Sequence, residues 1–457
     1  MRKKDSDMTQ GTIWKQLVAF ALPTMLGLVF QQLYNTVDTI VVGQFVGKEA
    51  LAAVGGVGPI CNTMIGLFNG ISIGATVVIS QSYGAHDEIR LEKAVHTAVA
   101  ASFLLGVFAT LLGTLMTTPM LNAISTPDDV MPQAHTYLSI YFSGIVFIMV
   151  YNMCAAILRA VGDSRRPLIF LVISAIVNTI LDLLFVIAFH MGVTGVGLAT
   201  LIAQAVSAVL ALITLIREKG IYRLNLKKLR IDLPSLKKII SIGMPAGIQQ
   251  ALTSFSNVFV QAHINGFGSA AMAGWSTHSK LDAYVSIPIQ SIAQASTPFV
   301  GQNWGAHKPE RARKGVRTAI ALALGSTSCV IVLVMVFARP LLMLFTTDAA
   351  VLEYGVYAVL ITSPFYVFMA LNQIFAGALR GIGASKVPMM IMIFSFVIFR
   401  QLYLYVATLL SNEFFFVGFS YPLGWIMAAI LLFIAYRHSA LCRPELAHVQ
   451  QKNKAHA

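Results

Sequence analysis

The chain repeats itself at long range. The segment at 81–86, QSYGAH, returns at 302–307 as QNWGAH, and the segment at 158–167, LRAVGDSRRP, returns at 379–388 as LRGIGASKVP. Both pairs are 221 residues apart. A duplicated bundle of helices encloses a site where its halves meet, and many transporters are built in this way. The repeat therefore predicts two similar halves.

The composition indicates that the repeat lies in a membrane. Hydrophobic residues make up 57% of the 457 residues and charged residues only 11%, and the mean hydropathy is +0.74. A spanning helix needs ~20 apolar residues, and lipid leaves exposed backbone groups unsatisfied, which favours helices. We therefore predict an all-α integral membrane protein with twelve spans, at roughly 14–37, 51–80, 94–117, 133–158, 165–189, 192–216, 238–262, 272–300, 315–337, 353–377, 386–410 and 415–437.

The basic residues predict the topology. If the chain starts in the cytoplasm, 28 of the 32 Lys and Arg fall in the two tails and the even-numbered loops. This distribution follows the positive-inside rule. We expect a multi-pass protein of a bacterial cytoplasmic (inner) membrane with both termini cytoplasmic. The net charge of +13 then reflects topology and attraction to membrane lipids, and no nucleic-acid partner is expected.

Each half of the chain holds six spans, so the two repeats enter the membrane from the same side and are parallel. We expect an N-terminal six-helix lobe at 1–216, a basic cytoplasmic linker at 217–237, a C-terminal six-helix lobe at 238–440 and a cytoplasmic tail at 441–457. In the repeated motif, Gly84 and Gly305 are expected to end their helices with a positive φ.

With twelve spans and repeated motifs, the chain resembles the multidrug and toxic compound extrusion (MATE) family over nearly its whole length. The Gln-x-x-Gly-Ala and Leu-Arg-x-x-Gly elements carry the resemblance, together with Pro23 and Pro245 in the openings of the two halves. The resemblance implies a V-shaped pair of six-helix lobes. It also implies export of bulky, mostly cationic organic compounds by alternating access, in exchange for protons or sodium. The chain is similar to the branch with an aspartate in the first span.

Ionisable side chains inside a membrane are candidates for function, because each costs ~2.5–3.5 kcal/mol at a helix centre. Asp38 lies in the first span, and Gln31, Tyr34 and Asn35 share its helical face. In the fifth span Asp182 follows Asn178 by one helical turn. The family resemblance implies an ion-coupling role for Asp38, Asn178, Asp182 and Thr200, and we add Asn35 and Gln31 as candidates.

The chemistry of two carboxylates supports the same choice. Two carboxyl groups that approach each other in an apolar cavity cannot both stay ionised cheaply, so the pair can hold a proton. A sodium ion would serve equally, since it accepts oxygen ligands of the kind that Asp38, Asn178, Asp182 and Thr200 supply. The alternative is that these polar residues only join helices by hydrogen bonds. No organic cofactor is expected.

The second half does not repeat these acids. At the corresponding positions of the second half, Val260 takes the place of Asp38 and Tyr403 takes the place of Asp182. We therefore expect ion coupling to be confined to the N-terminal half. The C-terminal half has Lys280, Asp282 and Arg400 instead. Asp282 shares a helical face with His278 and is either a second proton site, a group that attracts a cationic substrate, or the partner of a buried ion pair with Arg400 or Lys280.

A site for diverse organic cations needs aromatic and thioether surface with a few polar groups. The 28 Phe, 14 Tyr and 19 Met permit such a site without locating it. Our candidates for substrate binding are Tyr34, Asn152, Met64, Tyr141, Asp282, Tyr284 and Met369. In a membrane protein, such residues more often face lipid or pack in the core.

Other function classes fit the sequence less well. The only Gly-Lys pair, Gly47-Lys48, precedes Glu49, so no phosphate loop for ATP is present. No His-Glu-x-x-His arrangement occurs in the sequence, and the chain is not expected to be an enzyme. A lipid-linked oligosaccharide flippase would favour a cationic cavity, whereas the N-terminal half has acids. That flippase and an exporter of a specific metabolite stay as alternatives to a monomeric multidrug efflux transporter.

Overall fold

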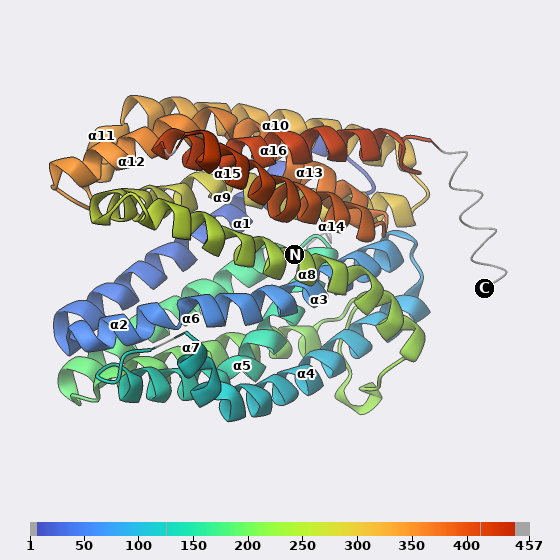
Figure 1. The fold of residues 1–457 in the computed structure, drawn as a ribbon. Coiled ribbons are helices and arrows are strands. Elements are labelled where there is room, and N and C mark those ends of the chain that lie inside the picture. The colour runs from blue at the N-terminus through green and yellow to red at the C-terminus, as the bar shows by residue number, and fades with distance from the viewer. Residues whose placement is uncertain (1–6, 125, 412, 444–457) are drawn as a thin grey trace. The chain divides into compact units, whose positions relative to one another are not determined.

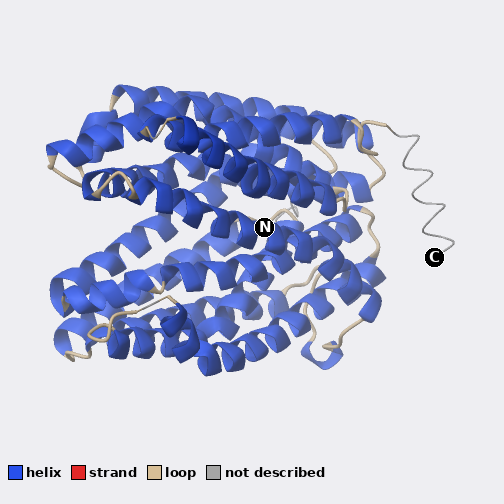
Figure 2. Ribbon diagram, in the orientation of Figure 1, coloured by secondary structure: helices blue, strands red, loops and turns tan. Residues whose placement is uncertain are grey.

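The structure is a computed structural model that describes residues 7–124, 126–411 and 413–443, and helices make up all regular structure in these ranges (Figure 2). The first half of the chain forms α1 (Ile13–Val41), η1 (Val42–Val46), α2 (Lys48–Gly56), α3 (Gly58–Gly84), α4 (Glu88–Ala123), α5 (Met131–Ala160), α6 (Arg165–Asp182), η2 (Leu183–Ala188), α7 (Gly192–Arg217) and η3 (Leu226–Lys228) (Figure 1). Residues 1–6 and most of the expected tail, 444–457, lie outside the described residues.

The second half forms α8 (Leu233–Asn265), α9 (Ser269–Gly305), α10 (Pro309–Val336), α11 (Ala338–Met343), α12 (Ala349–Thr362), η4 (Ser363–Phe365), α13 (Tyr366–Gly381), α14 (Lys386–Ile393), η5 (Phe394–Phe399), α15 (Arg400–Leu410) and α16 (Phe414–Arg437). Each predicted span coincides with one of these helices or with consecutive ones. The second span is broken at Val57, between α2 and α3.

Ten helical segments in the described ranges are long and apolar enough to cross a membrane. The helices α8 and α9, which hold the seventh and eighth predicted spans, are long enough but do not reach the same apolar character. The all-α integral membrane fold is confirmed. The extra polarity of α8 and α9 reflects the Ser, Thr, Gln and His residues that they bring into the second half.

The chain divides into two compact units. Unit 1 contains Leu26–Met244, and unit 2 contains Asp7–Met25 together with the chain from Pro245 onward. Both boundaries fall inside helices. The start of α1, up to Met25, belongs to unit 2, and the start of α8, up to Met244, belongs to unit 1. The expected lobes at 1–216 and 238–440 remain a prediction about which parts move together.

The basic segment at 217–237 is packed against unit 1. Tyr222 and Leu224 are buried in the core of that unit. The backbone N–H of Asn225 donates to Nε2 of His96 at 3.0 Å, and the N–H of Asp232 donates to Oγ1 of Thr97 at 3.0 Å. These contacts tie the segment to α4, while most of its other residues are exposed.

The repeated Gln-x-x-Gly-Ala motifs end α3 and α9 as expected, but the prediction of a positive φ at Gly84 and Gly305 was wrong. The left-handed residues are His86 (φ 52°) and His307 (φ 56°), two positions later. The N–H groups of the next residues bond back to Ser82 O at 3.1 Å and Asn303 O at 2.8 Å. The chain reverses in this C-terminal helix cap, and histidine is among the residues that tolerate the conformation.

One central helix organises each unit. In unit 1, α5 packs against α2, α3, α4, α6 and α7, and in unit 2, α9 packs against α10, α11, α12 and α13. The polar residues on the packed faces of α5 and α9, such as Tyr137 and His278, are therefore buried. Both helices carry candidate site residues from the sequence analysis, including Tyr141 and Asp282.

Small residues let the backbones of unit 1 approach closely, as is common between membrane helices. A Cβ added at Gly74 of α3 would lie 2.2 Å from the carbonyl oxygen of Ile239 and 2.8 Å from the backbone N of Gly243 on α8. A backbone carbonyl cannot move aside as the end of a side chain can. The close packing of α3 on α8 therefore requires glycine at 74.

We predict that Gly74→Ala destabilises the protein by about 1–3 kcal/mol, the usual cost of overpacking. Thermal unfolding of the detergent-purified protein measures the effect. Gly325→Ala on α10 is the matched control, because a Cβ there meets nothing within 4 Å. Equal melting temperatures for the two variants would contradict the close approach.

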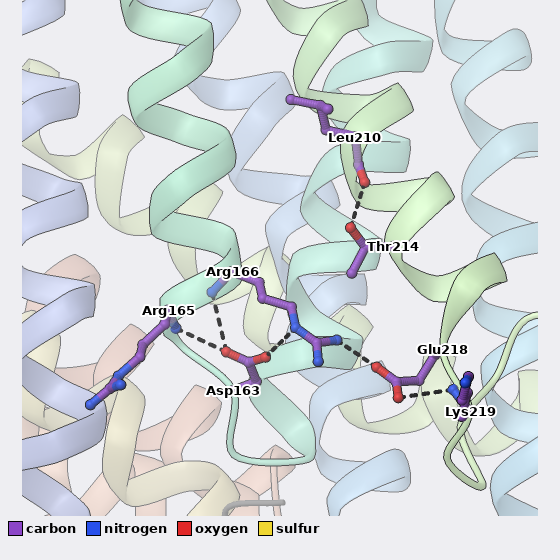
Figure 3. A network of polar contacts seen from close by, with 7 residues as sticks. All are labelled: Asp163, Arg165, Arg166, Leu210, Thr214, Glu218 and Lys219. Carbon is purple, nitrogen blue, oxygen red and sulfur yellow. Dashed lines mark hydrogen bonds and ion pairs between the residues drawn. The ribbon is translucent and has the colours of Figure 1, made fainter. Parts of the chain in front are cut away.

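An ion-pair network joins the start of α6 to the end of α7 (Figure 3). Arg166 Nε lies 3.0 Å from an oxygen of Asp163, and Arg166 Nη1 donates to Glu218 Oε2 at 2.5 Å. Burial by itself would raise the pKa of Glu218, but hydrogen bonds from Arg166, the Lys219 backbone and Tyr222 lower it. The pKa lies below its usual value as a result.

Because folding lowers the pKa of Glu218, its carboxylate stabilises the fold above the unfolded pKa and loses this effect as the pH falls. We predict that Glu218→Gln lowers the melting temperature at neutral pH and that the difference from wild type shrinks as the pH falls below about 4. Melting curves over a pH series measure it. Glu353→Gln, at an exposed position on α12, is the control. A difference that is independent of pH would rule out the charged network as its cause.

Candidate functional site

Asp38 and Asp182 are brought together in unit 1. Asp38 lies near the end of α1, and Asp182 is the last residue of α6, directly before the π-helical turn η2. Such turns are frequent at functional sites. The two carboxyl groups are hydrogen-bonding neighbours. Asp182 is fully buried, and neither of its oxygens has a conventional hydrogen-bond donor among the described residues.

Two carboxyl groups in this arrangement can form a hydrogen bond only when one of them carries a proton. If both were ionised, their repulsion in an apolar interior would be costly. The pair therefore needs one positive charge, which either a proton or a metal cation such as sodium supplies. This requirement is the chemistry that the geometry of unit 1 imposes.

Further unsatisfied polar atoms surround the pair. Asn178, one turn before Asp182, is buried, and both atoms of its amide lack a hydrogen-bond partner in the described part of the chain. Thr200 on α7 lies beside the hydroxyl of Tyr34, yet its own Oγ1 makes no hydrogen bond of standard geometry there. An unpaired buried polar group costs ~1–3 kcal/mol. These oxygen atoms fit the ligands that a sodium ion would need, and Asp38, Asn178, Asp182 and Thr200 would hold it.

The other two ion-coupling candidates, Gln31 and Asn35, are more exposed than the carboxyl pair. The side chains of Gln31 and Asn35 on α1 are exposed, whereas Asp38 is partly buried. Their roles remain predictions. The sequence alone did not indicate Tyr137 on α5. This residue is buried, and it lies close enough to Asp38 for an electrostatic interaction with that carboxyl group. Its position one helical turn before Tyr141 was the available signal.

The proposed substrate-binding residues of unit 1 occupy two places. Tyr141 forms a side-chain hydrogen bond with Cys61, and its ring stacks on that of Tyr137 with centroids 6.3 Å apart. Met64 packs against the same hydrophobic core. Asn152 instead lines a small apolar cavity formed by α3, α4 and α5.

In unit 2 the expected buried ion pairs are absent among the described residues. Arg400 donates from Nη2 to Ser256 Oγ and Asn257 Oδ1, both at 2.8 Å, and its guanidinium lies 4.9 Å from the ring centroid of Tyr421. Lys280 is exposed, with Nζ 5.8 Å from the ring centroid of Phe345. Neither cation forms a salt bridge with Asp282 in the part that the structure describes.

Asp282 has different neighbours. Its side chain hydrogen-bonds that of Tyr366, at the start of α13. Tyr284 is half-buried two residues further along α9, and Met369 packs against the main core of unit 2. Of the three readings of Asp282, the ion pair with Arg400 or Lys280 therefore loses support. A proton site and an attraction for a cationic substrate remain.

Comparison with known proteins identifies the family. The MatE family model matches residues 23–184 and 245–406, once in each half. The chain is 26% identical to the probable multidrug resistance protein YpnP of Bacillus subtilis, over 95% of this chain and 97% of that protein. It is 25% identical to an FAD transporter of Shewanella oneidensis, over 80% and 82%.

A solved structure shows the same fold. An outward-facing multidrug resistance MATE family transporter of the MOP superfamily superposes with a TM-score of 0.90 at 24% identity, covering 97% of this chain and all of that one. The two family matches, the relatives and the fold agree with the repeated motifs and the apolar helices. The chain therefore belongs to the MatE family of multidrug efflux transporters and is a multi-pass membrane protein.

Proposed function

We propose that this protein exports bulky, mostly cationic organic compounds in exchange for protons or sodium ions, by alternating access. The observation that carries the proposal is the pair of neighbouring carboxyl groups of Asp38 and Asp182 in the interior of unit 1. This pair needs one positive charge when it is buried, and it can stay charged only where water reaches it. Its occupancy by an ion therefore depends on the conformation.

Ion binding drives export only if the ion has different affinities for the outward-open and inward-open states. A conformation that buries the carboxyl pair away from water costs much free energy when no cation is bound. The cost is far smaller when a cation is bound. Asn178 and Thr200 add oxygen atoms that favour a bound cation. Tyr34, on which the charges of both carboxylates act, offers an aromatic ring to a cationic substrate.

The protein is placed in a bacterial cytoplasmic membrane with both termini in the cytoplasm. The asymmetry of the Lys and Arg residues between loops supports this orientation. The segments that carry the basic residues at 217–237 and at the start of α10 then lie on the cytoplasmic side. A monomer with small-molecule and lipid partners suffices for this mechanism.

We predict that Asp38→Asn and Asp182→Asn each abolish ion-coupled export, because an amide keeps the volume and removes the charge that the ion must balance. The double variant should be no worse than either single one, since the two residues act as a unit. Dye transport in proteoliposomes, with proton and sodium gradients imposed separately, measures the effect and identifies the ion.

Asp128→Asn is the matched control, because Asp128 is exposed in the loop before α5. It should transport as wild type does. Gradient-dependent export by either Asn variant, inserted in the membrane at wild-type levels, would refute the proposed ion site.

A second candidate is export of one specific metabolite. The similarity to the Shewanella FAD transporter favours testing it, because that protein carries a large anionic substrate rather than a cation. Loading the same proteoliposomes with FAD or with a cationic dye separates the candidates. Transport of FAD alone would replace the multidrug proposal.

A further inference from the structure

A second group of buried polar side chains lies within unit 2. His278 on α9 is 5% exposed, and it contacts Thr362 at the end of α12. Asp282 lies one turn further along α9 on the same face, and Tyr366 at the start of α13 hydrogen-bonds its carboxyl group. Three short segments of unit 2 thus bring a histidine, a carboxylate and two hydroxyl groups together.

The hydrogen bonds around Thr362 favour one tautomer of His278. The hydroxyl of Thr362 lies 2.9 Å from the carbonyl oxygen of Ala358, to which it can donate its single hydrogen. It also lies 2.9 Å from Nε2 of His278, and while it donates to Ala358 it can only accept from the imidazole. This arrangement favours a hydrogen on Nε2 of the neutral ring. The lone pair is then on Nδ1.

That lone pair has no hydrogen-bond partner. Nδ1 of His278 is buried, and no donor reaches it from the described residues. Oδ1 of Asp282 and Oγ of Ser363 are also buried without a hydrogen-bond partner among the described residues. Three buried polar atoms without partners, on segments that contact one another, would each cost ~1–3 kcal/mol if nothing ever bound there. A proton on Nδ1 would give the site a positive charge beside the carboxylate.

Two neighbours of His278 favour an imidazolium ion, although burial of the ring opposes its charge. The carboxylate of Asp282 is the charged group that favours the protonated ring. The centroids of the Trp275 and His278 rings lie 5.0 Å apart, within the range of a cation–π interaction. Nothing in the Nε2 contact with Thr362 needs to change when Nδ1 gains a proton, because Nε2 donates in both states.

The other ionisable groups considered around Asp282 are two phenols and two cations. Tyr366 on α13 and Tyr421 on α16 both interact electrostatically with Asp282. Arg400 on α15 is turned to Tyr421, Ser256 and Asn257 rather than to the carboxylate. Lys280, on α9 itself, is exposed and lies over the ring of Phe345. The carboxylate of Asp282 therefore has no salt-bridge partner in the described part of unit 2.

We propose that His278 is a proton-binding site of unit 2, with Asp282 as its counter-charge. Nδ1 accepts a proton from a hydronium ion through its lone pair, so that an N–H bond forms, an O–H bond breaks and water is released. The carboxylate of Asp282 balances the charge of the imidazolium. Asp282 thus acts on His278 as a positioning residue. The site is separate from the Asp38 and Asp182 pair, and it departs from our expectation that ion binding is confined to the N-terminal half.

Histidine NMR of the full-length protein in detergent, without any substrate, tests this inference directly. The chain has ten histidines, and ¹⁵N-labelled histidine reports the tautomer and the protonation of each ring. The signal lost in His278→Gln identifies His278, and His263→Gln at a half-buried position of α8 is the matched control. The glutamine amide keeps a donor for Thr362, so the variant retains that contact.

We expect His278 to be the Nε2–H tautomer at high pH and the imidazolium at low pH, within the range from about pH 5 to 9. In Asp282→Asn the imidazolium form should no longer be populated where wild type shows it. In Thr362→Val the acceptor is lost, so the neutral ring should also populate the Nδ1–H tautomer.

A ring that stays neutral over this range, or an imidazolium that forms equally well in Asp282→Asn, would overturn the inference. The inference does not depend on the export mechanism. Titration of His278 should persist in the Asp38→Asn, Asp182→Asn double variant, and failure of that variant to abolish coupling would leave this measurement unchanged.

Discussion

A polar atom buried without a partner costs free energy, and an apolar membrane interior makes this cost hard to avoid. In both units of this protein some of these atoms lie close together, those of Asp38 and Asp182 in unit 1 and those of His278 and Asp282 in unit 2. The carboxyl groups of Asp38 and Asp182 can be neighbours only if a positive charge joins them. The rest of unit 1, from the buried amide of Asn178 to the helix packing around α5, holds these groups where that charge must be supplied.

The duplicated scaffold carries different chemistry in its two halves. The helix order, the reversal at His86 and His307 and the central helices α5 and α9 recur. The polar content does not. Asn35 lies on the exposed side of α1, whereas its counterpart Asn257 accepts a hydrogen bond from the buried Arg400. Divergence of this kind gives one unit a pair of neighbouring carboxyl groups and the other a histidine beside a single carboxyl group.

The start of the chain shows how the two halves are tied. The N–H of Met8 donates to Gln302 Oε1 at 2.9 Å, and Asn303 and Arg311 donate to the carbonyl oxygen of Met8. These contacts give the repeated glutamine motif a role besides ending a helix. Because α1 begins in unit 2 and carries Asp38 in unit 1, a single helix joins the carboxyl pair to the other unit.

The sequence by itself determined the helical membrane fold, because the length and apolar character of a spanning segment are local properties. It also singled out Asp38, Asn178, Asp182 and Thr200, since charge in lipid is rare enough to be noticed. Only the tertiary structure decided that Asp38 and Asp182 meet, that Arg400 turns away from Asp282, and that Thr362 leaves the Nδ1 lone pair of His278 free. Those facts depend on distances between helices far apart in the chain, and no local pattern encodes them.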